Sequence, residues 1–186
     1  LGVGGASLPF IEDFESGLSG WEIANPDAGI TWAAATVNGT NPGSTAMTIN
    51  HYSYSATGAV DELISPAFDF TNDTLINLEF EYASAYYSSG YKDSLKVYAS
   101  DDCGSTWDLV AAYDGSDASF TTAGAVTSAF APADSTYWCH GSSSVTCPTI
   151  DLDAYSGSAG VRVKFVAVNG YGNNIYLDNI NISGQA

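Results

Sequence analysis

This sequence contains very little positive charge. Four Lys and Arg residues stand against 21 Asp and Glu, which gives a formal net charge of −17 over 186 residues. Because phosphate binding needs clustered Lys and Arg side chains, no nucleic acid is expected as a partner, and neither is an anionic membrane surface. An acidic chain rich in Ser, Thr, Asn, Gly and Tyr is typical of secreted or cell-surface proteins, and we expect that localisation.

Long apolar runs are also missing. No run approaches the roughly 20 apolar residues of a membrane-spanning helix, so we expect no membrane insertion. Residues 1–8 form a short uncharged segment without the pattern of a secretory leader, which favours a mature or excised domain of a larger multidomain protein. A hydrophobic content of 45% is enough for one sizeable core, and we expect one domain over residues 1–186.

Signatures of catalysis are scarce. The two histidines, His51 and His140, lie in no nucleophile motif, and the Gly-x-Ser-x-Gly pattern is missing. Two facing carboxylates of the kind that glycosidases use could arise by chance among 21 acidic residues, so such a pair would not be specific. We expect a protein that is not an enzyme, and keep an enzyme as the least favoured alternative.

Apolar and polar residues alternate with period two, which predicts strands. The clearest segments are 76–82, 94–99 and 161–167. Weaker candidates are 30–36, 46–50, 62–65, 107–113, 126–130 and 147–152. About ten short strands separated by turn residues predict an all-β sandwich.

The last strand changes its inward-facing positions near Asp178-Asn179. Apolar residues occupy odd positions before this point and even positions after it. A β-bulge inserts one residue and produces this switch, whereas a strand buried on both faces is the alternative.

The basic residues Arg162 and Lys164 fall at presumed outward strand positions, as do Glu79 and Glu81. If the two strands that carry them are neighbours, Glu–Arg and Glu–Lys pairs would stabilise their register by a few tenths of a kcal/mol each.

Acidic residues stand beside aromatic residues near both ends of the chain. Asp13 and Glu15 belong to the first such segment and Asp178 to the last. If the terminal strands pair, the three carboxyl groups converge and repel one another unless a cation lies between them. The sequence therefore predicts a Ca²⁺ site at these three residues, with Asp61 as a further ligand. The alternative is ordinary solvated acids at strand ends.

Aromatic side chains also cluster in predicted loops. The candidates for ligand binding are Tyr52, Tyr54, Tyr86, Tyr87, Tyr91, Trp138 and Tyr171. Tyr and Trp combine a flat apolar face with a polar group, which suits sugars and protein partners. We therefore expect a glycan or a cell-surface protein as the partner. The alternative is that these rings pack beneath the loops.

Two of the three cysteines are close in sequence. A disulfide between Cys139 and Cys147 would close a small loop, which oxidising compartments allow. Zinc bound by this pair and His140 is less favoured, because no fourth ligand is evident. Cys103 is left over, and we expect it to be a buried small apolar residue.

Four motifs in order along residues 9–183 together resemble a known family. They are Pro9-Phe10 with Asp13-Phe14-Glu15 and Gly20-Trp21, Asp61-Glu62-Leu63-Ile64-Ser65-Pro66-Ala67-Phe68-Asp69-Phe70, Asp93-Ser94-Leu95-Lys96-Val97-Tyr98-Ala99-Ser100 with Cys103-Gly104-Ser105-Thr106-Trp107, and Tyr171-Gly172-Asn173-Asn174-Ile175-Tyr176-Leu177-Asp178-Asn179-Ile180. The set resembles MAM-like, or cleaved-adhesin, β-sandwich domains of the gingipain haemagglutinin type from secreted and surface proteins of the Bacteroidetes.

The resemblance implies a jelly-roll sandwich of two antiparallel sheets, a structural calcium ion near the paired termini, and no catalysis. Domains of this family occur in adhesins, in haemagglutinins and beside secreted proteases. Two functions follow as expectations: adhesion through loops, or a structural spacer or accessory domain of a secreted protease with no ligand of its own. Segment 135–148 matches no fixed motif of the family.

Overall fold

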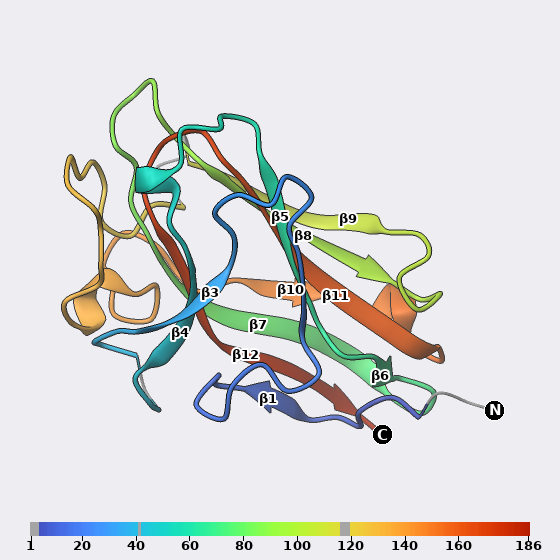
Figure 1. Ribbon diagram of the computed structural model, residues 1–186. Helices are drawn as coiled ribbons and strands as arrows, with labels where there is room; N and C mark the ends of the chain where they lie inside the picture. The colour runs from blue at the N-terminus through green and yellow to red at the C-terminus, as the bar shows by residue number, and fades with distance from the viewer. Residues whose placement is uncertain (1–3, 41, 116–119) are drawn as a thin grey trace.

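The computed structural model describes residues 4–40, 42–115 and 120–186. Over these ranges two antiparallel sheets of six strands each face one another, and no α-helix is present (Figure 1). The expected all-β jelly-roll sandwich is confirmed. In the described part of the chain, no helix is long and apolar enough to cross a membrane.

The two sheets have the following strand orders. The first contains β10 (Thr149–Asp151), β7 (Thr74–Ser84), β12 (Ile175–Gln185), β4 (Thr45–Ile49) and β3 (Ala33–Thr36), with β1 (Phe10–Glu12) also paired to β12. The second contains β2 (Glu22–Ala24), β5 (Val60–Ile64), β11 (Ala159–Val168), β8 (Ser94–Ser100) and β9 (Asp108–Asp114), with β6 (Phe68–Asp69) paired to β11. Short 3-10 helices lie in loops: η1 (His51–Ser53), η2 (Ser135–Tyr137) and η3 (Asp153–Tyr155).

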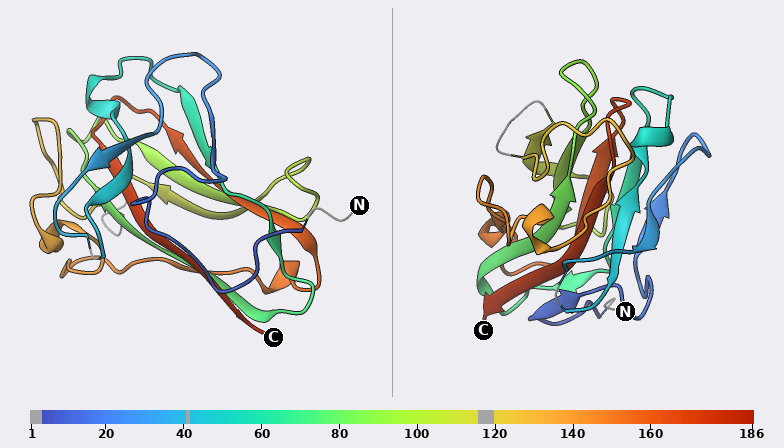
Figure 2. Two further views of the ribbon diagram at one scale, coloured as in Figure 1. Left: turned by 60° about the horizontal axis from the view of Figure 1, so that its bottom comes forward. Right: turned by 90° about the vertical axis from the view of Figure 1, so that its left-hand side faces the viewer.

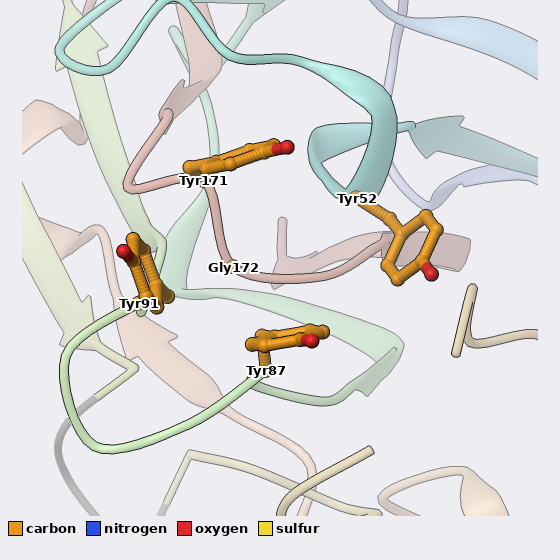
Figure 3. Close-up of a pocket in the computed structure, with 5 residues that line it drawn as sticks. All are labelled: Tyr52, Tyr87, Tyr91, Tyr171 and Gly172. Atoms are coloured by element: carbon orange, nitrogen blue, oxygen red, sulfur yellow. The ribbon is translucent and has the colours of Figure 1, made fainter. Parts of the chain in front are cut away.

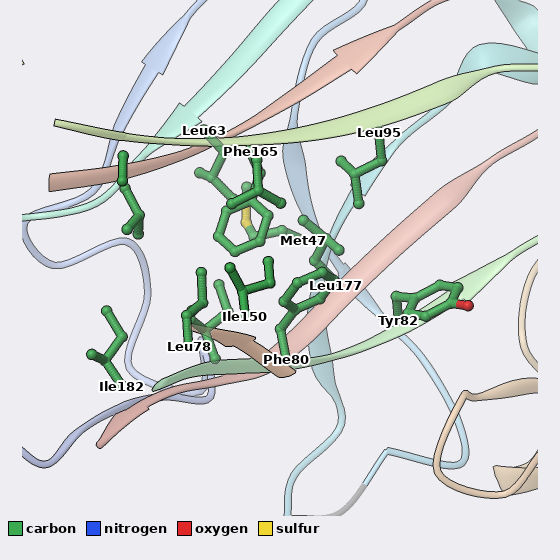
Figure 4. Packing of buried hydrophobic residues seen from close by; sticks show 14 of the residues in the cluster. Met47, Leu63, Leu78, Phe80, Tyr82, Leu95, Ile150, Phe165, Leu177 and Ile182 are labelled. Carbon is green, nitrogen blue, oxygen red and sulfur yellow. The ribbon is translucent and has the colours of Figure 1, made fainter. Parts of the chain in front are cut away.

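The core lies between the sheets, where the alternating apolar side chains meet (Figure 4). Leu78 and Phe80 of β7 face inward with at most 1% of their surface exposed. The Phe80 ring packs edge-to-face against Phe165 of β11, with ring centroids 5.1 Å apart. Complete burial of such a side chain contributes about 1.5–3 kcal/mol, so the inward-facing positions of the period-two pattern help to hold the sheets together.

One predicted strand does not form. Segment 126–130 is irregular, although the other predicted segments each contain a strand. The Asn173 side chain supplies the hydrogen-bond partners that the backbone of a neighbouring strand would supply. Its Nδ2 donates to the carbonyls of Val126 and Ser128 at 2.8 and 2.9 Å, and its Oδ1 accepts from the Phe130 amide at 2.8 Å.

The terminal strands pair as expected. β1 runs antiparallel to the end of β12, with Phe10 opposite Ile182 (Figure 1). The register of β12 against β7 shifts between Asp178 and Asn181, and Asn179 has a positive φ of 48°. The β-bulge is therefore confirmed, and it explains why the inward-facing positions change.

The predicted charge pairs between β7 and β11 are wrong, because these strands belong to different sheets. The partners of β11 are β5, β6 and β8. Lys164 instead contacts Glu62 of β5 at 2.8 Å, and Arg162 contacts Glu22 of β2 at 2.7 Å. The sequence pattern identified outward-facing charges correctly but not which strands are adjacent.

The predicted disulfide joins Cys139 to Cys147, with Cα atoms 4.9 Å apart. The burial expected for Cys103 is wrong. This free cysteine is exposed in the turn between β8 and β9, where it has a positive φ of 60°. The turn lies at the edge of the sandwich and exposes the residue, although its Sγ atom lies close to Gly160 of β11.

Candidate functional site

Four tyrosines from three separate loops line one pocket (Figure 3). Tyr52 lies in η1, Tyr87 and Tyr91 lie between β7 and β8, and Tyr171 lies between β11 and β12. Together with Gly172 they surround a volume of about 390 Å³, and we call this site the tyrosine pocket. The sequence predicted all four tyrosines as ligand-binding candidates but did not predict that they converge.

The rings of the tyrosine pocket form a chain of contacts. Centroids of Tyr52 and Tyr87 are 6.3 Å apart, those of Tyr87 and Tyr91 are 6.1 Å apart, and those of Tyr91 and Tyr171 are 5.9 Å apart. The last two pairs are edge-to-face, an arrangement in which each aromatic pair contributes about 0.5–1.5 kcal/mol. The rings therefore support one another, while Tyr87, Tyr91 and Tyr171 remain 36%, 47% and 42% exposed.

Tyr86 and Tyr54 lie outside the residues that line this pocket. Tyr86 is half-buried, with the Lys92 ammonium 5.3 Å from its ring centroid. The proposed exposure of Tyr54 is wrong, because only 7% of its surface is accessible. Its hydroxyl donates to Asp27, and this hydrogen bond raises the pKa of Tyr54 to about 12.

The proposed exposure of Trp138 is also wrong. Segment 131–148 folds over β7 and β12, as the right-hand view of Figure 2 shows, and the Cys139 amide bonds to the Tyr82 carbonyl at 2.9 Å. Trp138 is 0% exposed and fills a small second core with Phe130 and Tyr176. The Trp138 Nε1 group donates to the Asn38 carbonyl at 2.8 Å, so neither its ring nor its polar group can reach a ligand.

Asp178, the central residue of the predicted calcium site, is fully buried at the β-bulge. Its Oδ2 accepts a hydrogen bond from the Thr40 hydroxyl, and its Oδ1 accepts from the Asn179 amide at 2.8 Å. Burial raises the pKa of Asp178, these two hydrogen bonds lower it, and the nearby carboxylates of Glu81 and Glu15 raise it, which together bring it to about 7.

The other predicted calcium ligands occupy different environments. Glu15 is exposed, and its Oε1 accepts from the amides of Ser44 and Thr45 at 2.6 and 2.5 Å, which lowers its pKa. Asp13 is half-buried and accepts from the Glu15 amide at 3.1 Å. Asp61 belongs to β5 of the other sheet, where complete burial raises its pKa.

Among the described residues, no group of three or more His, Cys, Asp or Glu side chains is arranged to hold a metal ion. The four predicted ligands therefore do not form one carboxylate cage. Glu15 and Asp178 are close enough to interact electrostatically, and Thr40 adds a hydroxyl oxygen at Asp178. These are hard oxygen donors of the kind that Ca²⁺ takes, with backbone carbonyls completing the shell, so calcium stays a prediction.

The sequence did not predict a second pocket, which has a volume of about 400 Å³. It lies on the outer face of the first sheet, and its polar lining includes Glu79, Glu81, His140, Asn179 and Asn181. His140 Nδ1 lies 3.2 Å from Glu81 Oε2, which also accepts from Asn179 Nδ2 at 2.9 Å. The alternation of Glu79 and Glu81 indicated an outward face, but nothing in the pattern placed His140 above it.

Comparison with known proteins shows a fold shared by adhesin domains and carbohydrate-binding modules. No protein-family model and no curated protein matches the sequence. The K1 cleaved adhesin domain of Lys-gingipain from Porphyromonas gingivalis is similar with a TM-score of 0.65 and 19% identity, over 96% of this chain and 99% of that one. The similarity confirms the cleaved-adhesin type of sandwich that the four motifs suggested.

Two carbohydrate-binding modules have the same fold. The CBM27-1 module of Caldicellulosiruptor saccharolyticus, in complex with mannohexaose, has a TM-score of 0.59 and 17% identity, over 94% of this chain and 96% of that one. TmCBM61, in complex with β-1,4-galactotriose, has a TM-score of 0.55 and 12% identity, over 94% and 95%. At these identities the similarity establishes the fold.

Proposed function

We propose that this protein is a non-catalytic adhesion module that binds a neutral oligosaccharide through the tyrosine pocket. One observation carries the proposal: four tyrosine rings from three loops surround a single pocket of about 390 Å³. That volume lies in the range of small-molecule sites, roughly 300–1,000 Å³. Partly exposed rings offer flat apolar faces together with hydroxyl groups.

A neutral sugar fits this chemistry better than a charged one. Among the described residues, four tyrosines and one glycine line the pocket, and no charged side chain does. Tyrosine faces can stack on the apolar face of a sugar ring, while their hydroxyls bond to sugar hydroxyls. The net charge of −17 disfavours an acidic ligand. Support also comes from two modules of the same fold in complex with neutral oligosaccharides.

Secretion or display on the cell surface, within a larger multidomain protein, completes the proposal. The Cys139–Cys147 disulfide supports it, because disulfides persist in oxidising compartments. The acidic composition agrees with the same localisation.

Titration calorimetry with mannohexaose, β-1,4-galactotriose and xylohexaose, together with a glycan array, tests the proposed binding. We expect Tyr87→Ala to weaken binding at least about 10-fold, which corresponds to about 1.4 kcal/mol. Tyr137→Ala is the matched control, because Tyr137 is 37% exposed and does not line the pocket. Its affinity should stay within about twofold of the wild type.

An array that stays blank at high protein concentration would contradict glycan binding and favour the structural spacer. Equal losses in Tyr87→Ala and Tyr137→Ala would place the binding surface outside the tyrosine pocket. Binding only to a glycosylated protein, and not to its released glycan, would indicate a cell-surface protein as the partner.

We also propose that Ca²⁺ stabilises the domain at the bulge of β12. A buried carboxylate such as that of Asp178 is unfavourable as an anion without a compensating charge. Asp178, Glu15 and Thr40 would supply oxygen ligands, with Asp13 close to Glu15 in the chain. Bound Ca²⁺ would neutralise the gathered carboxylates and thereby stabilise the paired termini.

A further inference from the structure

A buried carboxylate, that of Asp93, binds the amide of Gly172, which lines the tyrosine pocket. Asp93 is 3% exposed and stands directly before β8. Its Oδ1 accepts hydrogen bonds from the amides of Gly170 and Gly172 at 2.8 and 3.2 Å. Its Oδ2 accepts from the Asn173 amide at 2.7 Å. A single side chain therefore holds three amides of the loop that carries Tyr171.

The same carboxylate is linked to the other two loops. His51, which is fully buried, places its Nδ1 3.1 Å from Asp93 Oδ1. His51 is the first residue of η1 and directly precedes Tyr52. Asp93 itself ends the segment that carries Tyr87 and Tyr91. The pair His51–Asp93 therefore joins all three loops that line the pocket.

The loop packs closely against Asp93 and the residue before it. A Cβ atom at Gly170 would lie 1.8 Å from the Lys92 carbonyl oxygen, and one at Gly172 would lie 2.3 Å from Asp93 Oδ2. Tyr171 between them has a positive φ of 55°, an unfavourable conformation for a residue with a side chain. The Tyr171 amide itself donates to Asn169 Oδ1 at 2.8 Å, and Asp93 holds the amides on both sides of Tyr171.

A buried carboxylate is suited to this task. It only accepts hydrogen bonds, and bonds to a charged acceptor are roughly twice as strong as neutral ones. In Asp93→Asn one oxygen becomes an NH₂ group that faces amide donors. The substitution conserves shape but reverses part of the hydrogen-bonding pattern.

We propose that Asp93 and His51 are positioning residues that set the geometry of the tyrosine pocket for its ligand. This inference rests on the proposed function. Neither residue lines the pocket, and both act through the backbone of the loops that carry the tyrosines. Asp93 fixes Tyr171 against Tyr91, and His51 fixes Tyr52 against Tyr87.

The first arm of the test is calorimetric titration of mannohexaose, at a temperature where every variant is folded by circular dichroism. We expect Asp93→Asn to weaken binding about 10-fold. Asp102→Asn is the matched control, because Asp102 follows the other end of β8 and its Oδ1 accepts from the Thr106 amide at 2.9 Å. This variant should keep the affinity of the wild type.

Two variants of His51 provide a second comparison, which tests the positioning role even if Asp93→Asn fails to fold. The Asn side chain places an N–H donor close to the position of the imidazole Nδ1, whereas Leu offers none. His51→Asn should therefore retain most of the affinity for mannohexaose, and His51→Leu should lose about 10-fold. Equal affinity losses in the two variants would overturn a positioning role based on the Asp93 contact.

The second arm needs no ligand and follows hydrogen exchange of the amides at Gly170, Gly172 and Asn173. We expect at least 10-fold faster exchange in Asp93→Asn and an unchanged rate in Asp102→Asn. Unchanged exchange in Asp93→Asn would overturn the inference. So would faster exchange with unchanged affinity for mannohexaose. A wild-type protein that binds no oligosaccharide would instead contradict the proposed function, and the exchange rates would still decide whether Asp93 holds the loop.

Discussion

The hydroxyl of Thr40 donates a hydrogen bond to the buried carboxylate of Asp178, although the two residues are 138 positions apart in the sequence. The contact lies at the bulge where β12 changes the positions that face the core. It connects the segment after β3 to the last strand of the sandwich. The protonation and the cation binding of Asp178 should therefore influence the stability of the whole domain.

Calcium should raise the melting temperature. A ligand that binds only the native state adds about 2.7 kcal/mol when its free concentration is 100 times its dissociation constant. For a chain of 150–250 residues, 1 kcal/mol corresponds to about 2–4 °C, so we expect a rise of roughly 5–10 °C in scanning calorimetry. Asp178→Asn should abolish most of this response. A melting temperature that is the same in Ca²⁺ and in chelator would rule the site out.

Without calcium, stability should fall as the pH rises from about 4 to about 7. The usual pKa of 3.8 applies to Asp178 in the unfolded chain, whereas burial raises it to about 7 in the native state. Between these values the native state binds more protons, so its advantage is present at low pH and is lost as the pH rises. At about 1.4 kcal/mol per pKa unit, the loss is on the order of 4 kcal/mol.

Urea denaturation in chelator at several pH values measures this effect. Asp178→Asn stays uncharged, so its stability should fall much less over the same range. Asp101→Asn, at an exposed position in the turn after β8, should follow the wild type. Parallel pH profiles for the wild type and Asp178→Asn would show that Asp178 is not the responsible group.

Tyr54 should ionise well above the usual pH of tyrosine. The hydrogen bond to Asp27 raises the pKa of Tyr54 to about 12, so a late step should be visible when tyrosine ionisation is followed by absorbance. The stability that Tyr54 contributes should be lost as the pH rises from about 10 through about 12. Tyr54→Phe should remove one tyrosine from the late step, to which Tyr113, Tyr155 and Tyr176 also contribute because burial raises their pKa. Oligosaccharide affinity should stay unchanged, because Tyr54 does not line the pocket. A loss of oligosaccharide affinity in Tyr54→Phe would show that Tyr54 contributes to binding.

Replacement of Trp138 should affect stability rather than recognition. Trp138 is 0% exposed in the small second core, and Trp→Ala changes in a core cost about 3–5 kcal/mol. Denaturant unfolding should show this loss for Trp138→Ala and a much smaller one for the neighbouring Tyr137→Ala. At temperatures where both variants are folded, oligosaccharide affinity should match the wild type. Selective loss of binding by folded Trp138→Ala would contradict this assignment.

The sequence by itself determined the strands, their inward faces and the bulge. Side chains alternate across a strand, so a local pattern with period two predicts that Leu78 and Phe80 face the core. The change from odd to even positions around Asp178-Asn179 required an extra residue for the same reason. The Cys139–Cys147 bond also depends on residues that are close in the chain.

Only the tertiary structure decided which elements lie side by side. The alternation gives each strand a buried face but no partner, which is why the predicted pairing of Glu79 and Glu81 with β11 was wrong. Trp138 is buried because a loop folds over the sheet, and no periodic pattern describes such a loop. Tyr52 and Tyr171 meet the other two pocket tyrosines because Asp93 holds loops that are distant in sequence. It accepts hydrogen bonds from the Tyr171 loop and contacts His51, which precedes Tyr52. Contacts of this kind depend on the assembled fold, since no local pattern encodes them.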